Sequence, residues 1–468
     1  MRRFSLLLLL FVVTVAHAQP DASHSRMEAM EAEVDSVLSA WNGADRPGIA
    51  VAYFEGGETV FKKAYGLANM EHGIAWRTDT VSDLGSVSKQ FIGFALALLA
   101  EEGALSLDDD IRTHLPDLPD LGATITIDDL IYHRSGLREI YATLGMINWR
   151  SGDGIFQEHA QTLVQHQAEL QFEPGSRYLY NNTEYMLMAD IIEVVTGKEF
   201  HDWMRERIFE PLGMDDTTIM VRQGQVIPGA ATSYGRDRAG HWNQIYDNST
   251  IQGAGGIYST VEDVGKWMRN FTTHEVGTAA TIEALTTTGY LTDGEPIDYA
   301  RGIVVTEVGG QIVWVHNGAS AGYRAQMFYL PEHDRGYAMV MNTPSMFNPH
   351  GALTRAFFAD VIVEEERSGS SGTRAEQPQP APLDDPAAFV GTWLSDELQT
   401  FYEIREEGDG LVLAHRWLGS NDMTWKGDDA FRVGFGGEVR FERDAAGRPS
   451  KFTWDNGRTI GVSFRRYE

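Results

Sequence analysis

The stretch Leu84-Gly85-Ser86-Val87-Ser88-Lys89-Gln90-Phe91 places a hydroxyl and an amine three residues apart, where an apolar segment begins. Residues 87–102 are predicted to form a helix that ends at Gly103. Because positions three apart share one helix face, Ser86 and Lys89 are expected to point the same way. The apolar surroundings would lower the pKa of Lys89, so that a neutral amine could accept the serine proton and Ser86 could act as a nucleophile.

The Ser-x-x-Lys pattern alone is a weak signal. About two matches would arise by chance in a chain of this length at average composition, and this chain has one. The alternative interpretation is a serine that caps a helix, followed by a solvated lysine. If Ser86 is a nucleophile, its backbone N–H at the helix N-terminus is a candidate donor to an oxyanion.

A second pattern, Tyr180-Asn181-Asn182, precedes a predicted helix over residues 183–196. In an extended segment Tyr180 and Asn182 point the same way, so a phenol that moves protons and an amide that binds a substrate carbonyl could share one cleft. Tyr246-Asp247-Asn248 has the same spacing, but no helix follows it directly, which favours Tyr180. A buried tyrosine with Asn182 capping the helix remains an alternative.

A third pattern, His316-Asn317-Gly318, follows a predicted strand. The two-residue spacing places His316 on the side where Gly318, which lacks a side chain, allows a substrate backbone to approach. The N–H of Ala319 is then a candidate second oxyanion donor. A lone histidine at a strand end is more often structural, so this pattern has weight only as part of a set.

Taken in this order, the three patterns resemble the serine β-lactamase-related family, which comprises class C β-lactamases, D-alanyl-D-alanine carboxypeptidases, D-aminopeptidases and related esterases. The resemblance spans about residues 26–366 and includes two further segments, His133-Arg134-Ser135-Gly136-Leu137 and Gly253-Ala254-Gly255-Gly256. It implies a penicillin-recognising serine hydrolase without a cofactor or metal.

The resemblance also implies a role for each matching residue. Ser86 would be acylated by an amide or ester, with Lys89 and Tyr180 moving the proton. The N–H groups of Ser86 and Ala319 would hold the oxyanion, and the substrate-binding residues would be Asn182, His316 and Gly318.

One departure bears on the substrate. Members of the family that recognise a carboxylate usually have Lys-Thr-Gly where this chain has His316-Asn317-Gly318. A histidine is mostly neutral near pH 7 and is a weaker anchor for a carboxylate than a lysine. Efficient β-lactamase or carboxypeptidase activity is therefore not expected. The histidine form resembles the D-aminopeptidases and esterases of the family, and this resemblance implies a D-amino-acid peptide or amide, or a small ester, as the substrate.

The N-terminal segment and the composition limit the expected compartment and the expected classes of partner. Residues 1–18 read as a signal peptide, with Arg2 and Arg3, an apolar run and a cleavage site near Ala18, so the protein is expected in the periplasm or outside the cell. No later apolar stretch is long enough to cross a membrane. The net charge of −29 argues against nucleic acid as a partner, and the absence of cysteine excludes disulfides and thiol catalysis. The expected partner is a small-molecule or peptide substrate, and the sequence carries no signal of oligomeric state.

The pattern of elements predicts an α+β fold. Strands are predicted near both ends of the larger part of the chain, with helices between them, which suggests an antiparallel sheet built from both ends, flanked by helices and joined to a helical region. The predicted strands are residues 48–53, 59–65, 311–316, 323–330 and 336–341, and flanking helices are predicted at residues 27–41 and 352–366. The predicted domains are a catalytic domain (19–367), a linker rich in Ser, Gly, Pro and Gln (368–385) and a small all-β barrel or sandwich (386–468).

Two rival interpretations remain. Gly318-Ala319-Ser320-Ala321-Gly322 matches the nucleophile elbow of α/β-hydrolases, which would make Ser320 the nucleophile, but that elbow needs a strand before it and a helix after it. The second rival is a non-catalytic penicillin-recognising protein that binds or senses cell-wall fragments without turnover.

Overall fold

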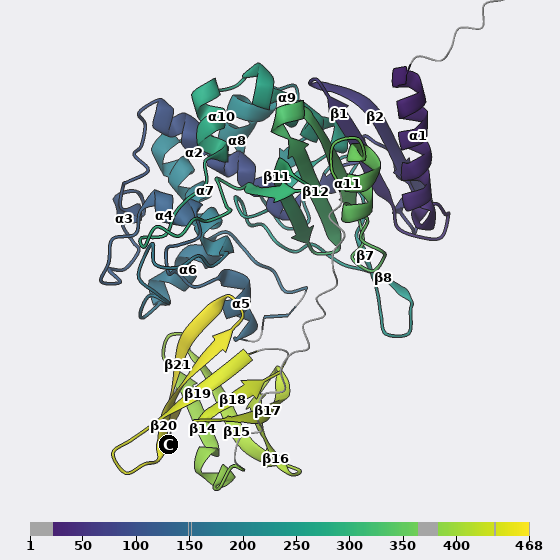
Figure 1. The fold of residues 1–468 in the computed structure, drawn as a ribbon. Coiled ribbons are helices and arrows are strands. Elements are labelled where there is room, and N and C mark those ends of the chain that lie inside the picture. The colour runs from purple at the N-terminus through teal and green to yellow at the C-terminus, as the bar shows by residue number, and fades with distance from the viewer. Residues whose placement is uncertain (1–21, 148, 151, 364–381, 435–436, 468) are drawn as a thin grey trace, which may run out of the picture.

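The computed structural model consists of a larger part, in which helices surround a sheet, and a smaller barrel (Figure 1). It describes residues 22–147, 149–150, 152–363, 382–434 and 437–467. The predicted signal peptide and most of the predicted linker lie outside these ranges. Within them, no helix combines the length and the apolar character that crossing a membrane requires.

The centre of the larger part is a six-stranded antiparallel sheet in the order β10-β11-β12-β13-β1-β2. Strands from the two ends of this part meet where β1 pairs with β13, with Ala52 opposite Ala338. The prediction of an α+β fold with a sheet built from both ends is therefore confirmed. The strands are β1 (Ile49–Glu55), β2 (Glu58–Tyr65), β10 (Val304–Val308), β11 (Gln311–Ser320), β12 (Tyr323–Leu330) and β13 (Arg335–Met341).

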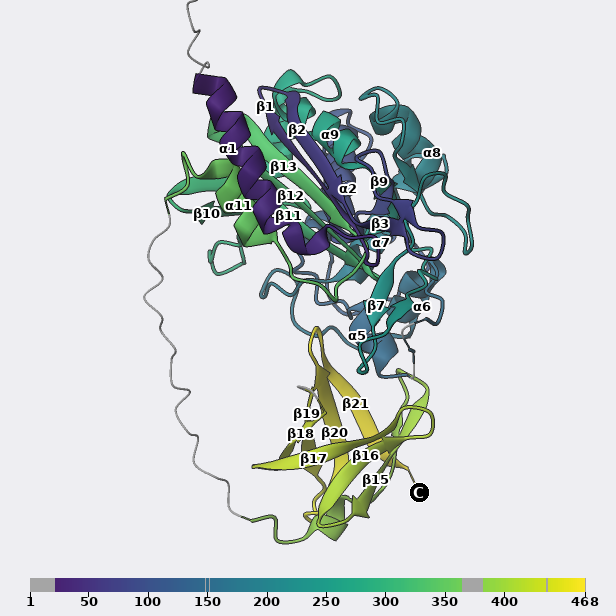
Figure 2. The same cartoon turned by 90° about the vertical axis from the view of Figure 1, so that its right-hand side faces the viewer.

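Side chains of β1 alternate between two apolar cores, as the two-residue period of a strand requires. Ala52 and Phe54 belong to the core that contains α9 (Val261–Thr273), whereas Val51 and Tyr53 belong to the core that contains α1 (Ala22–Val37) and α11 (His350–Phe358). Helices thus cover both faces of the sheet (Figure 2).

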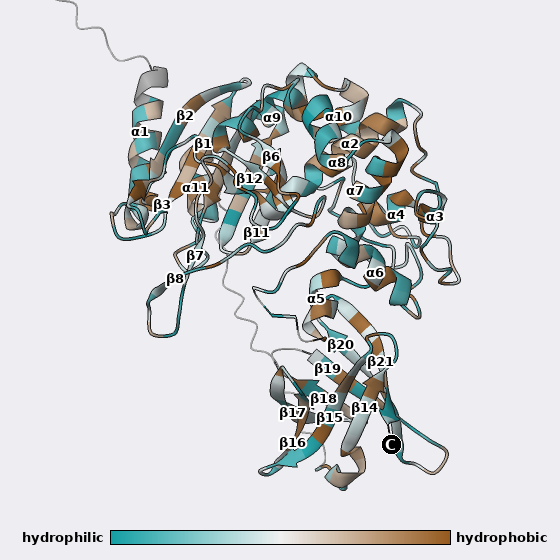
Figure 3. Cartoon of the chain, turned by 180° about the vertical axis from the view of Figure 1, so that it is seen from behind, coloured by the Kyte–Doolittle hydropathy of each residue, from teal (hydrophilic) through white to brown (hydrophobic). Residues whose placement is uncertain are grey.

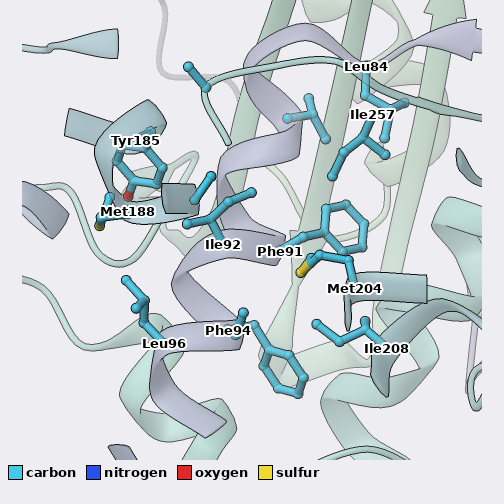
Figure 4. Packing of buried hydrophobic residues seen from close by; sticks show 14 of the residues in the cluster. Leu84, Phe91, Ile92, Phe94, Leu96, Tyr185, Met188, Met204, Ile208 and Ile257 are labelled. Atoms are coloured by element: carbon cyan, nitrogen blue, oxygen red, sulfur yellow. The ribbon is translucent and has the colours of Figure 1, made fainter. Parts of the chain in front are cut away.

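The helical region is built around α2 (Lys89–Glu101), which is buried along almost its whole length. Its apolar side chains pack against α7 (Asn182–Thr196) and against α8 (Phe200–Met204) with the turn that follows it (Figure 4). The remaining helices are α3 (Ile111–His114), α4 (Ile127–Ile131), α5 (Ile140–Gly145), α6 (Glu158–His166) and α10 (Ala279–Thr286). The short strands of this part are β3 (Leu67–Asn69), β4 (Ile74–Ala75), β5 (Ser82–Asp83), β6 (Thr218–Ile219), β7 (Tyr234–Arg236), β8 (Trp242–Gln244) and β9 (Ile257–Ser259).

The C-terminal part is a closed eight-stranded barrel, the first of the two predicted forms. Apolar and polar residues alternate along its strands (Figure 3). The apolar set fills the interior with aromatic side chains such as Trp393 and Phe452. The strands are β14 (Gly391–Ser395), β15 (Thr400–Glu407), β16 (Gly410–His415), β17 (Gly419–Gly427), β18 (Ala430–Val433), β19 (Gly437–Arg443), β20 (Pro449–Asn456) and β21 (Thr459–Tyr467).

Several predicted boundaries were wrong. The first helix begins earlier and ends at Val37, and a separate 3-10 turn covers Ser39–Trp41. The helix predicted over residues 352–366 ends at Phe358, and the described chain then continues as a turn. The strand predicted to end at His316 continues to Ser320, because its backbone stays paired with β12.

The α/β-hydrolase interpretation is excluded by this topology. Ser320 pairs with Tyr323 across a tight turn in which Ala321 has a φ of 44°, and the chain then continues as β12. A strand therefore lies where the nucleophile elbow requires a helix.

Candidate active site

Ser86 lies in a 3-10 turn, η2 (Gly85–Ser88), which leads directly into α2. Two glycines allow this turn to press against β11. A Cβ on Gly85, whose φ is 51°, would lie 2.6 Å from the Ala319 nitrogen, and a Cβ on Gly318 would lie 1.9 Å from the Leu84 oxygen. The absence of side chains at these two positions therefore brings Ser86 and Ala319 together, as an oxyanion hole made of their N–H groups requires.

The Lys89 side chain is completely buried, and its Nζ lies 3.2 Å from Ser86 Oγ. Burial lowers the pKa of Lys89 well below its usual value, and the charge of Arg458 adds to this effect, whereas Glu139 and Glu184 oppose it. The structure therefore shifts Lys89 toward its neutral form.

The neutral amine has two N–H groups and one lone pair, and two acceptors occupy the N–H groups. Lys89 Nζ donates to Asn182 Oδ1 at 2.8 Å and to the Ala254 carbonyl oxygen at 2.7 Å. The lone pair is then left for the Ser86 hydroxyl, which is the arrangement that a general base needs.

Tyr180 lies beside this pair, with the centroid of its ring 5.0 Å from Lys89 Nζ. Burial raises the pKa of the Tyr180 hydroxyl, and the neighbouring Ser86 side chain offsets only part of that rise. Tyr180 is therefore protonated at neutral pH, and any role in proton transfer would be that of a donor or relay and not of a phenolate.

The helix cap at α7 is Asn181, whose side chain accepts from the Thr183 N–H at 2.9 Å. The alternative in which Asn182 caps the helix was therefore wrong. The Asn182 amide instead contacts Lys89 through its oxygen and donates to Glu139 Oε1 at 2.6 Å through its nitrogen. Both ends of this amide are engaged by the protein, so Asn182 positions Lys89 before any substrate is present.

His316 is buried and uncharged. Its Nδ1 lies 2.8 Å from the Asn317 carbonyl oxygen, which can only accept, so Nδ1 carries the proton and Nε2 accepts from the Tyr299 hydroxyl at 3.2 Å. Burial lowers the pKa of His316 to about 4. A neutral imidazole with both nitrogens occupied cannot take the place of a lysine as a carboxylate anchor.

The site opens into a cleft of about 870 Å³. Six of the seven predicted site residues line this cleft, and Lys89 lies buried beneath Ser86. The six are Ser86, Tyr180, Asn182, His316, Gly318 and Ala319. Asp247 and Tyr246 of the second Tyr-x-Asn pattern also line the cleft, but Tyr246 is largely exposed.

Sequence reasoning missed three residues of the site: Glu139, Tyr299 and Arg458. Glu139 lies just beyond the quoted segment that ends at Leu137, whereas Arg458 belongs to the barrel and lines the same cleft as Ser86. Within the described ranges, no group of three or more His, Cys, Asp or Glu side chains is arranged to hold a metal ion.

A family model described as Beta-lactamase matches residues 30–360. Two D-aminopeptidases are similar over most of the chain. That of Gluconobacter oxydans is 26% identical over 394 residues, covering 84% of this chain and 71% of that protein. That of Brucella anthropi is 28% identical over 387 residues, covering 82% of this chain and 70% of that protein.

Two solved structures share the fold. The octameric penicillin-binding protein homologue from Pyrococcus abyssi has a TM-score of 0.62 at 21% identity, covering 94% of this chain and 99% of that one. The D-amino acid amidase from Ochrobactrum anthropi SV3, complexed with L-phenylalanine amide, has a TM-score of 0.57 at 23% identity, covering 71% of this chain and 98% of that one.

Proposed function

Because the chain belongs to the Beta-lactamase family, whose model matches residues 30–360, we propose that it hydrolyses D-amino-acid amides and short D-aminoacyl peptides through an acylated Ser86. The observation that carries this proposal is the Ser86 to Lys89 pair. The amine is buried, favours its neutral form, and has both N–H groups occupied by Asn182 and Ala254. Its lone pair is thereby directed at the serine.

In the proposed reaction, Lys89 takes the Ser86 proton as Ser86 Oγ attacks the substrate carbonyl. The N–H groups of Ser86 and Ala319 hold the oxyanion that forms. The proton then passes from Lys89 through Tyr180 to the leaving nitrogen, and the amine departs. Water enters, gives a proton to Lys89 as it attacks the acyl carbon, and releases the acid while Ser86 regains its proton.

Three observations support the proposed substrate class. The similar proteins from Gluconobacter oxydans and Brucella anthropi are named D-aminopeptidases. The cleft also has carboxylates, Asp153 and Asp247, in its lining, and these suit the ammonium group of an amino-acid amide. The neutral His316 disfavours the carboxylate recognition typical of β-lactamases.

We further propose that residues 1–18 direct export and that the mature chain acts in the periplasm or outside the cell. N-terminal sequencing of protein recovered from the periplasm tests this. A mature chain that begins at or close to Gln19 is expected, and retention of residues 1–18 on protein in the cytoplasm would contradict it.

The first experiment is intact-protein mass spectrometry with a fluorophosphonate probe, run beside hydrolysis of D-alaninamide and a short-chain p-nitrophenyl ester. We expect labelling and turnover in the wild type and in Ser320→Ala, and neither in Ser86→Ala. Persistence of both in Ser86→Ala would disprove the proposed nucleophile. Labelling without turnover would instead support the binding or sensing alternative.

A further inference from the structure

The turn between β20 and β21 carries a cation from the barrel into the catalytic cleft. Asn456 pairs with Thr459 across a two-residue turn, in which Gly457 has a φ of 62° and Arg458 stands beside it at the tip. Figure 2 shows this hairpin reaching from the barrel toward the larger part of the chain. Arg458 is thus presented on a tight turn, which has far less freedom than a long loop.

Residues on both sides of Arg458 form hydrogen bonds with the larger part of the chain. Thr459 Oγ1 accepts from the Glu139 N–H at 3.2 Å and lies 2.9 Å from Thr143 Oγ1. On the other side, Asn456 Nδ2 donates to the Ala142 carbonyl oxygen at 3.1 Å. These contacts fix the position of the turn at the edge of the cleft.

A buried ion pair adds a second attachment. Arg138 Nε donates to Glu397 Oε1 at 2.6 Å, and Arg138 also donates to the Ile460 carbonyl oxygen. The Ile460 N–H donates to Gln171 Oε1 at 2.5 Å. The barrel is therefore held by several directional contacts near its β20–β21 turn, so Arg458 occupies a defined place.

Arg458 lines the cleft together with Ser86, and its guanidinium lies 5.3 Å from the centroid of the Tyr180 ring. Stacking on this face leaves the N–H donors at the edge of the guanidinium free to bind other groups. Among the described residues, no carboxylate pairs with Arg458 and no acceptor takes a hydrogen bond from it. A guanidinium has five N–H donors in a planar fork that matches a carboxylate.

The other basic groups of the site are occupied or uncharged. Arg324 donates to the backbone oxygens of Ala321 and Tyr323. Lys89 is engaged by Asn182 and Ala254, and His316 by Tyr299 and the Asn317 oxygen. Within the part of the cleft that the structure describes, Arg458 is therefore the positively charged group that is available to bind an anionic part of a ligand.

We propose that Arg458 binds a free carboxylate on the substrate, so that the cleft selects short D-aminoacyl peptides ending in a carboxylate over the corresponding amides. This inference rests on the proposed function for the D-aminoacyl part of the substrate. Such a peptide is a zwitterion, and the cleft offers carboxylates for its ammonium group as well as Arg458 for its carboxylate. Arg458 is then a specificity-determining residue that the barrel supplies.

The test compares two ligands that differ only at the C-terminal group, D-alanylglycine and D-alanylglycinamide. Binding is measured by calorimetry on the full-length Ser86→Ala protein, so that the result does not depend on hydrolysis. We expect the free acid to bind about 10- to 100-fold more tightly than the amide, since hydrogen bonds between charged groups are worth this much.

In the double variant Ser86→Ala/Arg458→Gln, the preference for the free acid over the amide is expected to fall below about 3-fold. Arg458→Lys in the same background keeps the charge without the planar guanidinium, so it is expected to retain part of this preference. Arg432→Gln, which removes an exposed arginine of β18, is the matched control and keeps the full preference. Equal binding of the two peptides, binding of neither, or a preference that survives Arg458→Gln would overturn the inference. If the fluorophosphonate probe fails to label Ser86 in the wild type, that result would contradict the proposed function and not this inference.

Discussion

Asn182 donates a hydrogen bond of 2.6 Å to Glu139, and this contact joins Lys89, the proposed general base, to the interface with the barrel. The other end of the same amide accepts from Lys89, while the backbone N–H of Glu139 donates to Thr459 of the barrel turn. Glu139 therefore lies between the proposed general base and the barrel. A substitution at Glu139 or in the barrel turn can therefore alter the position or the pKa of Lys89.

Glu139 and Arg458 should shift the pH profile in opposite directions. Glu139 raises the pKa of Lys89, so Glu139→Gln lowers that pKa and moves the acid limb of kcat/KM to lower pH. Arg458 lowers the pKa of Lys89, so Arg458→Gln moves the limb to higher pH. The measurement is the pH dependence of kcat/KM for a neutral p-nitrophenyl ester. The groups that face Lys89 are Glu139, Glu184, Arg458, Tyr180, Tyr185, His133 and His316.

The control for this pair is Glu158→Gln, which removes an exposed carboxylate of α6 and should leave the limb in place. A merely structural role of Glu139 would lower activity at every pH without displacing the limb. Shifts of both variants in the same direction would contradict the proposed identity of the base.

Gly85→Ala should abolish labelling of Ser86, because the new Cβ would lie 2.6 Å from the Ala319 nitrogen. The matched control is Gly103→Ala, at which φ is also positive, at 71°, but no atom lies within 4 Å of the added Cβ. Both variants should lose about 1–2 kcal/mol of stability to the left-handed backbone. Gly85→Ala alone should also lose its reaction with the fluorophosphonate probe. Equal labelling of the two variants would show that this close approach is not needed.

The directions of the side chains within the three sequence patterns were predictable because each pattern spans only a few residues. Ser86 and Lys89 are three residues apart, Tyr180 and Asn182 are two apart, and simple periodicity gives the direction of their side chains. Five of the six strands of the sheet were predictable from their apolar or alternating residues, whereas the short edge strand β10 was not predicted. Boundaries were less certain, because pairing with β12, which local composition does not reveal, extends β11 to Ser320.

Arg458 could not be assigned to the site from the sequence, because its place depends on contacts between segments more than 300 residues apart, such as Glu139 with Thr459. The available signal was Asn456-Gly457 between two alternating strands, which predicts a turn but not what the turn approaches. The expected role of Asn182 in substrate binding stays a prediction, since its amide is engaged by Lys89 and Glu139.

His316 should make the protein less stable in acid. Its pKa is lowered to about 4 in the folded state from an ordinary value near 6.5, so the unfolded chain binds the proton more tightly. The contribution is complete above about pH 6.5 and is lost as the pH falls toward 4, by about 3 kcal/mol at most. Urea unfolding at pH 7 and pH 4 should show a smaller loss in His316→Gln than in the wild type. His72→Gln, which removes an exposed histidine, should behave like the wild type.

Glu397→Gln should loosen the barrel from the catalytic domain, because it leaves the guanidinium of Arg138 buried without its counter-charge. The side chains of this ion pair are only 1% and 6% exposed, and the loss of one buried partner costs about 3–5 kcal/mol. Asp396→Asn is the control at the adjacent position, since its ion pair with Arg465 has side chains that are 65% and 52% exposed and contributes less than about 1 kcal/mol. We expect calorimetry to resolve separate transitions for the two domains in Glu397→Gln and one in Asp396→Asn, with the carboxylate preference reduced only in the former. An unchanged single transition in both variants would show that the Arg138–Glu397 pair does not couple the two domains.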